Sequence, residues 1–100
     1  MIHVIATTTV LPNQRDEFRR MMPETHAEDD CFAYQPLSDA PPGVHKAQRP
    51  PRLVVVTISE RWRDLAALRA QLVAPHMAAY RSRVKDPVAS AHLQILAQPV

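Results

Sequence analysis

The alternation of apolar and polar residues predicts four strands along the chain. The strongest is Arg52 to Trp62, where four consecutive apolar residues lead into an alternating segment that contains no breaker. Three shorter segments are rich in β-branched or aromatic residues and end at turn residues or proline: Ile2 to Val10, Cys31 to Gln35 before Pro36, and Val88 to Leu96. We expect the 52–62 strand to be central in a single sheet.

A first amphipathic helix is predicted after the turn that follows residue 10. Asn13 is a candidate N-cap, acidic residues come early, and Phe18, Met21 and Met22 recur at three- and four-residue spacing. Pro23 should kink this helix or end its regular part.

A second helix is predicted from Asp64 to Val84. Its apolar stripe consists of Leu65, Leu68, Leu72, His76 and Ala79. Pro75 interrupts the segment, and a second helical piece can begin there because proline is tolerated in a first turn. The proline-rich stretch from Ser38 to Pro51 is predicted to be a loop.

The resulting order, β-α-β-β-α-β, is that of an α+β ferredoxin-like fold in one domain, residues 1–100, with an antiparallel sheet and both helices on one face. A chain of this length buries about two thirds of its extended surface. With 46% hydrophobic residues and apolar side chains directed at both faces of the sheet, the bare face favours a homodimer.

Several classes of function are disfavoured by composition. The net charge is only +2, and the cations and the aromatic residues are dispersed, which is not the pattern of a nucleic-acid-binding face. A single Gly cannot build a P-loop, a G-x-G-x-x-G loop or a G-x-S-x-G elbow. No apolar run approaches the ~20 residues that cross a bilayer. With one Cys and no signal-like N-terminus, a cytoplasmic location is expected.

Metal binding has no strong signal either. His26, Glu28, Asp29, Asp30 and Cys31 form a dense run of potential ligands, but such a run does not by itself supply a three- or four-ligand geometry. His3 and His92 lie on strands that this fold makes adjacent, at positions that need not face each other. We therefore predict no metal site.

Four short motifs resemble the antibiotic biosynthesis monooxygenase family. They are Pro12-Asn13-Gln14 before an acid-rich helix, the Cys31 entry to a strand, Glu60-Arg61-Trp62-Arg63-Asp64 at a strand-to-helix junction, and Ala74-Pro75-His76-Met77. The resemblance covers nearly the whole chain except the 38–51 loop, which is longer than usual and could cover a pocket or a partner surface. Asp30 and Ala74 stand where members usually have Gly and often Ser.

The resemblance implies a dimeric α+β barrel with a pocket in each protomer between the helices and the sheet. Members include monooxygenases that oxidise quinols or polycyclic phenols without a cofactor, and haem-degrading enzymes. The haem-degrading members resemble one another in an Asn on the first strand. The only Asn here is Asn13 in the turn, which argues against haem.

His76 is the candidate catalytic residue. Its place on the apolar stripe, one turn after Leu72 and one turn before Tyr80, predicts that the imidazole points into the helix–sheet interior. A neutral imidazole there could accept a phenolic proton near pH 7. The alternative is a histidine held in the core or at a helix cap by a hydrogen bond.

The candidate substrate-binding residues are Trp62, Tyr80, Leu72, Phe18 and Met22. Trp62 shares the parity of Val56, Ile58 and Glu60, so it either stacks on an aromatic ligand or fills the core. Glu60 on this apolar face needs a partner, such as an Arg across the dimer, unless it serves catalysis. The aromatic residues and methionines can equally be core or adaptable pocket wall.

The function that these features favour is oxidation of a small aromatic phenol or hydroquinone by O₂ with neither cofactor nor metal. A base forms the electron-rich phenolate, which reduces O₂ in an apolar pocket. A non-catalytic dimer that binds a small molecule or serves assembly remains an alternative, since fold does not establish activity. Haem degradation is a third.

Overall fold

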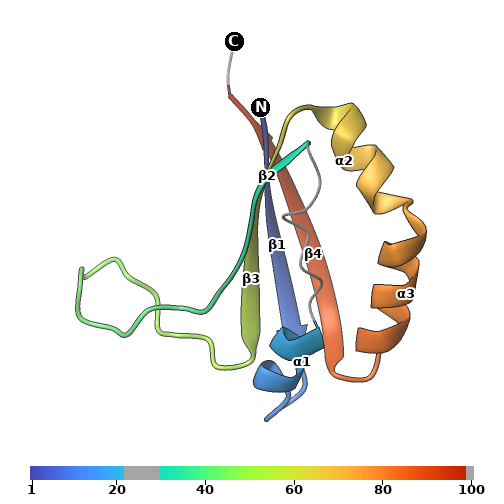
Figure 1. Ribbon diagram of the computed structural model, residues 1–100. Coiled ribbons are helices and arrows are strands. Elements are labelled where there is room, and N and C mark those ends of the chain that lie inside the picture. The colour runs from blue at the N-terminus through green and yellow to red at the C-terminus, as the bar shows by residue number, and fades with distance from the viewer. Residues whose placement is uncertain (22–29, 99–100) are drawn as a thin grey trace.

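The computed structural model describes residues 1–21 and 30–98 and contains four strands and three helices (Figure 1). In chain order the elements are β1 (Ile2–Val10), α1 (Arg15–Met21), β2 (Cys31–Leu37), β3 (Val55–Trp62), α2 (Leu65–Leu72), α3 (Pro75–Val84) and β4 (Val88–Ala97). The predicted α+β order is confirmed. The predicted break at Pro75 is also confirmed, since it separates α2 from α3.

The four strands form one antiparallel sheet in the order β2-β3-β1-β4. β3 lies between two neighbours, as expected for its long apolar run. It begins at Val55 rather than at Arg52. The reason is local, because the Arg52 backbone N–H donates to a side-chain oxygen of Asp39, 2.8 Å away.

Two further predicted element boundaries are wrong. Asn13 does not cap α1, which begins at Arg15; it lies in the preceding turn with a positive φ of 65°, a conformation that Asn tolerates better than most residues. β2 continues through Pro36 to Leu37, because an edge strand can accept a residue that has no N–H. Met22 and Pro23 lie outside the described residues.

The helices and the sheet enclose the core on one face only (Figure 1). Every second residue of β1 and β3 points to this face, so that Val4, Val56 and Trp62 are almost completely buried there together with Phe18 of α1. The other face carries the intervening residues, many of them Thr or Ser. We call it the open face.

A hydrogen bond, an ion pair and an aromatic contact hold the helices in position over the sheet. Asp64 caps α2, since its Oδ1 accepts from the backbone N–H of Ala67 at 2.8 Å. Its neighbour Arg63 forms an ion pair with Asp30 at 2.6 Å, which ties the end of β3 to the start of β2. Deeper in the fold, the rings of Phe18 and Tyr80 join α1 to α3 at a centroid distance of 6.5 Å.

Residues 38–54, which we call the arm, contain no helix or strand and project from the sheet on the side away from α2 and α3 (Figure 1). Arg52 closes the base of the arm through two side-chain hydrogen bonds to Asp39, at 2.7 and 2.9 Å. Gln48 bridges its interior by donating to the carbonyl of Pro41 at 2.9 Å. The predicted loop is therefore confirmed, and these hydrogen bonds hold its conformation.

The single chain exposes 7048 Å² of surface. A compact monomer of 11.3 kDa would expose about 5,700 Å². The arm and the open face leave more surface in water than a chain of this size ordinarily does.

Candidate functional site

A cavity of about 430 Å³ lies between α2 and α3 on one side and the sheet on the other. Its walls are mostly apolar or aromatic. The lining residues are Ala6, Thr8, Phe18, Tyr34, Ile58, Glu60, Leu68, Gln71, Leu72, Met77, Tyr80, Arg81, Val84, Lys85, Val88, Ala91 and Leu93.

Glu60 is the only acidic residue among the described residues that line this cavity. It lies two residues before Trp62 on β3, so the strand period places both side chains on the helix side of the sheet. The indole Nε1–H of Trp62 donates to Oε1 of Glu60 at 2.9 Å. Within the described part of the chain, no other side chain pairs with this carboxylate.

Burial raises the pKa of Glu60 above its ordinary value, and the hydrogen bond from Trp62 offsets part of that rise. A carboxylate with a raised pKa is a stronger base than a solvated one. The partner expected from the sequence was a group such as an Arg across a dimer; the partner in the structure is an indole of the same strand.

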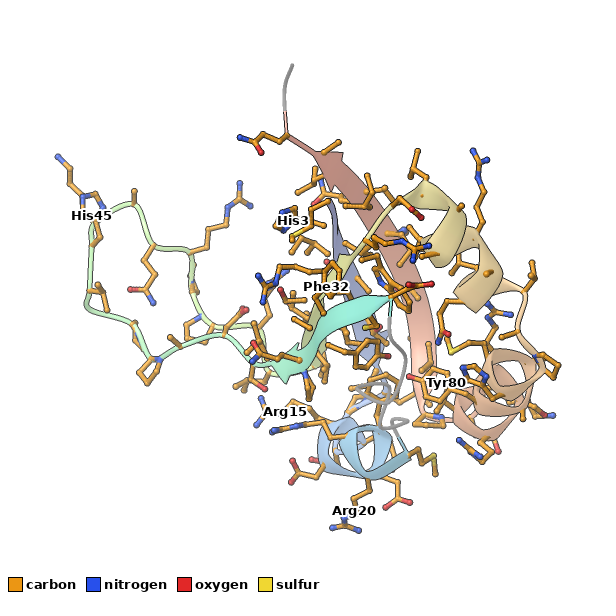
Figure 2. The ribbon with its side chains drawn as sticks, turned by 45° about the horizontal axis from the view of Figure 1, so that its top comes forward. His3, Arg15, Arg20, Phe32, His45 and Tyr80 are labelled. Carbon is orange, nitrogen blue, oxygen red and sulfur yellow. The ribbon has the colours of Figure 1, made fainter. Side chains whose placement is uncertain are left out.

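Two tyrosines share the cavity with this carboxylate. Tyr34 lies opposite Glu60 in the β2–β3 register, and Tyr80 enters from α3 (Figure 2). Burial, with a smaller contribution from the negative charge of Glu60, raises the pKa of Tyr80 to about 12, and burial raises the pKa of Tyr34 as well. Both phenols stay protonated at neutral pH and can donate hydrogen bonds.

The cavity opens between α3 and β4. Among the described residues that line it, four are exposed, and they come from α3, its C-cap and β4: Arg81, Lys85, Ala91 and Leu93. Arg81 is fixed in place because its Nη2 donates to the carbonyl of Leu72 at the end of α2, 2.6 Å away.

Three of the predicted substrate-binding residues line the cavity: Tyr80, Leu72 and Phe18. Trp62 does not, since it is completely buried in the core, where it supports Glu60. Of the two readings of Trp62, the core one is therefore confirmed. Met22 falls outside the described residues.

The expectation that His76 points into the interior is wrong. His76 is exposed and is not among the cavity-lining residues. The stripe was extrapolated from α2, but the break at residues 73–74 starts a new helix with its own rotational phase. In α3 the inward positions are Met77, Tyr80, Arg81 and Val84, with the spacing of one helix face.

Sequence reasoning missed Gln71, Arg81 and Lys85. Arg81 and Lys85 share the helical spacing of Met77, Tyr80 and Val84, so a stripe counted from Pro75 would have found them. Gln71 is buried in the wall of the cavity, one residue before Leu72. A search for apolar residues at helical spacing does not identify a buried glutamine.

Within the described residues, no cluster of three His, Cys, Asp or Glu side chains could hold a metal ion. The register places His3 opposite Leu96 and His92 opposite Thr7, four positions apart along β1, so the two histidines do not face each other.

No helix in the described part of the chain is long and apolar enough to cross a membrane.

The chain is similar to several known proteins. It is 33% identical over 102 residues to the Escherichia coli protein named "Probable quinol monooxygenase YgiN", with 96% of each chain covered. In fold it is similar to a Deinococcus radiodurans structure, with a TM-score of 0.77, 18% identity and coverage of 100% of this chain and 94% of the other. Rv0793 from Mycobacterium tuberculosis gives a TM-score of 0.74 at 24% identity, covering 99% and 95%.

The sequence profile of the antibiotic biosynthesis monooxygenase family matches residues 1–83, which include β1, β2, β3, α2 and the cavity-lining positions of α3 up to Arg81. Together with the similarity over nearly the full length to the Escherichia coli relative, this match shows that the chain belongs to the antibiotic biosynthesis monooxygenase family.

Proposed function

We propose that this protein is a monooxygenase that oxidises a small aromatic phenol or hydroquinone with O₂. The observation that carries the proposal is an apolar and aromatic cavity whose inner end presents a carboxylate of raised pKa, Glu60. The family and the quinol monooxygenase name of the relative support the same reaction class.

The reaction balances without an external reductant. A hydroquinone and O₂ give a hydroxyquinone and water; one oxygen atom enters the ring and the other leaves as water. The ring supplies all four electrons. The protein must therefore remove a phenolic proton, hold the anion beside O₂ and exclude bulk water.

Each step has a residue in the cavity. Glu60 accepts the phenolic proton, and the indole N–H of Trp62 holds its carboxylate in place. Tyr34 and Tyr80 are neutral donors positioned near the developing oxyanion. Phe18, Ile58 and Leu72 contribute apolar wall against the ring.

The test is oxygen consumption with a naphthohydroquinone, corrected for autoxidation, together with ¹⁸O₂ labelling of the product. Glu60→Gln keeps the shape of the side chain and removes the base, so the rate should fall on the order of 10²- to 10⁴-fold. Incorporation of one labelled oxygen atom is expected in the product.

His76→Ala is the matched comparison, because His76 remains the alternative base proposed from the sequence. If His76→Ala loses the rate and Glu60→Gln keeps it, the base is His76 and our assignment is wrong. If the hydroquinone binds and the wild-type protein consumes no O₂ above the background, the protein is a small-molecule-binding module instead.

We also propose that the protein is a homodimer through the open face. Leu37 and Leu96 are 46% and 48% exposed and lie on this face by register. The chain also exposes more surface than a compact monomer of its mass. Light scattering at low micromolar concentration should give twice 11.3 kDa. Leu96→Glu should shift the protein to monomer; a wild-type monomer would refute the proposal.

A further inference from the structure

Two positive charges flank the mouth of the cavity. Arg81 and Lys85 are both exposed and both line it. Lys85 is the C-cap of α3 and keeps a helical backbone conformation, so it lies four residues after Arg81 on the same side of the helix. Among the described residues that line the cavity, Glu60 carries the only negative charge. The mouth is therefore cationic.

No negative side chain in the described part of the chain neutralises these cations, since none of the ion pairs there includes Arg81 or Lys85. Arg81 has one guanidinium nitrogen engaged with the Leu72 carbonyl, which fixes its direction and leaves further N–H donors for another acceptor. Two like charges at this spacing disfavour each other slightly unless an anion lies between them.

The sheet register separates these cations from the carboxylate. Glu60 lies opposite Val4 of β1, whereas Val88, three residues after Lys85, lies opposite Val10. Six strand positions at about 3.3 Å each correspond to about 20 Å along β1. Arg81 lies one helical turn before Lys85, so its backbone is about 5.4 Å nearer to Glu60 along the helix axis.

We infer that the substrate is an aromatic hydroxy acid, which presents its hydroxyl to Glu60 and its carboxylate to Arg81 and Lys85. The inference rests on the proposed function, because it takes the cavity as the substrate site. The side chains of Glu60, Arg81 and Lys85 all line the cavity between these backbone positions, and an extended ring system with its two groups at opposite ends lies along the line that joins them. Guanidinium and ammonium groups both recognise carboxylates through charge-assisted hydrogen bonds.

The experiment compares two probes by isothermal titration calorimetry: 2-naphthol, which is neutral, and 6-hydroxy-2-naphthoate, which carries a carboxylate at the far end of the same ring system. We expect the naphthoate to bind on the order of tenfold more tightly, since one charge-assisted contact is worth about that factor. The advantage should shrink with added salt.

Lys85→Gln should lower naphthoate affinity about three- to tenfold and leave 2-naphthol affinity unchanged. Lys46→Gln is the matched control, because Lys46 is the other lysine of the chain and lies in the exposed arm. Arg81→Lys should keep part of the advantage by retaining the charge. Circular dichroism checks that each variant is folded.

Each outcome decides between the proposals. Equal binding of the two probes, or a naphthoate advantage that survives Lys85→Gln, overturns this inference while the binding of 2-naphthol still supports the cavity as a site. Binding of neither probe overturns the cavity as a substrate site and this inference together. Loss of the advantage in Lys46→Gln as well as in Lys85→Gln would show a general charge effect and overturn the inference.

Discussion

The cavity and the arm each contain one carboxylate with a perturbed pKa, and the two pKa values move in opposite directions. Glu60 is enclosed by apolar walls with an uncharged indole as its partner, and its pKa is raised by burial. Asp39 accepts three hydrogen bonds from Arg52, which lower its pKa to about 2. The same functional group therefore becomes a proton acceptor in one region and a permanent anion in the other.

The comparison shows what each region is suited to do. A charged partner removes any tendency of Asp39 to take up a proton, so the contact is structural and holds the base of the arm. A neutral donor orients Glu60 without supplying positive charge, so it offsets only part of the rise in pKa that burial causes. The variants below test this contrast, in order of decreasing expected effect.

Trp62→Ala should destabilise the protein by about 3–5 kcal/mol, because it removes a fully buried indole and leaves a cavity beside the pocket. Denaturant unfolding followed by circular dichroism measures the effect. Trp62→Phe retains much of the volume and should cost less. A Trp62→Ala variant with unchanged midpoint would show that the indole is not part of the core.

The rate of substrate oxidation should rise with pH through the raised pKa of Glu60, because only the ionised carboxylate accepts a proton. Trp62→Phe removes the hydrogen bond that lowers this pKa, so the rising limb should move to higher pH. A profile that does not move would separate Trp62 from the proton acceptor.

Stability should respond to the same group with the opposite sign. An acid whose pKa is higher in the folded than in the unfolded state holds its proton more tightly when folded. Its contribution is therefore full below the ordinary pKa and is lost as pH rises through the raised one. In Glu60→Gln this part of the pH dependence of unfolding should disappear; its persistence would assign it to another group.

Asp39→Asn should have the smallest effect on global stability, under about 1 kcal/mol, since the ion pair with Arg52 is partly exposed. The local effect should be clear, as faster proteolysis of the arm. Because the pKa of Asp39 is lowered, its contribution is present above its ordinary pKa of about 4 and is lost as pH falls toward about 2. Oxidation activity should not change; a loss of activity would link the arm to the cavity.

Much of this structure follows from short-range pattern. The alternation in residues 2–10 and 55–62, the proline at position 75 and the turn residues around Asn13 specify strands, a helix break and a turn from a few neighbours each. The order of the elements then leaves few topologies, which is why the sheet was predictable. The family was expected from the resemblance of four short motifs, and three of the pocket residues from that resemblance and the helical spacing.

The misplacement of His76 has a single origin. The stripe that assigned His76 to the interior assumed one continuous helix, whereas the break before Pro75 lets α3 rotate about its own axis. That rotation is decided by packing, with Tyr80 against Phe18 and Val84 in the core, and it brings Arg81 to the cavity and leaves His76 exposed. The local signal of this rotation is the spacing of Met77, Tyr80 and Val84 counted from Pro75.

The sequence by itself determined which segments are strands and helices, because hydrophobic periodicity and backbone constraints act over a few residues. It also determined that Glu60 and Trp62 share a face, since that follows from the strand period. Only the tertiary structure decided that the indole donates a hydrogen bond to the carboxylate, that two tyrosines share the cavity with Glu60, and that two cations lie at the mouth of the cavity. The tyrosines and the cations come from segments far from Glu60 along the chain, and their positions depend on how the helices pack on the sheet.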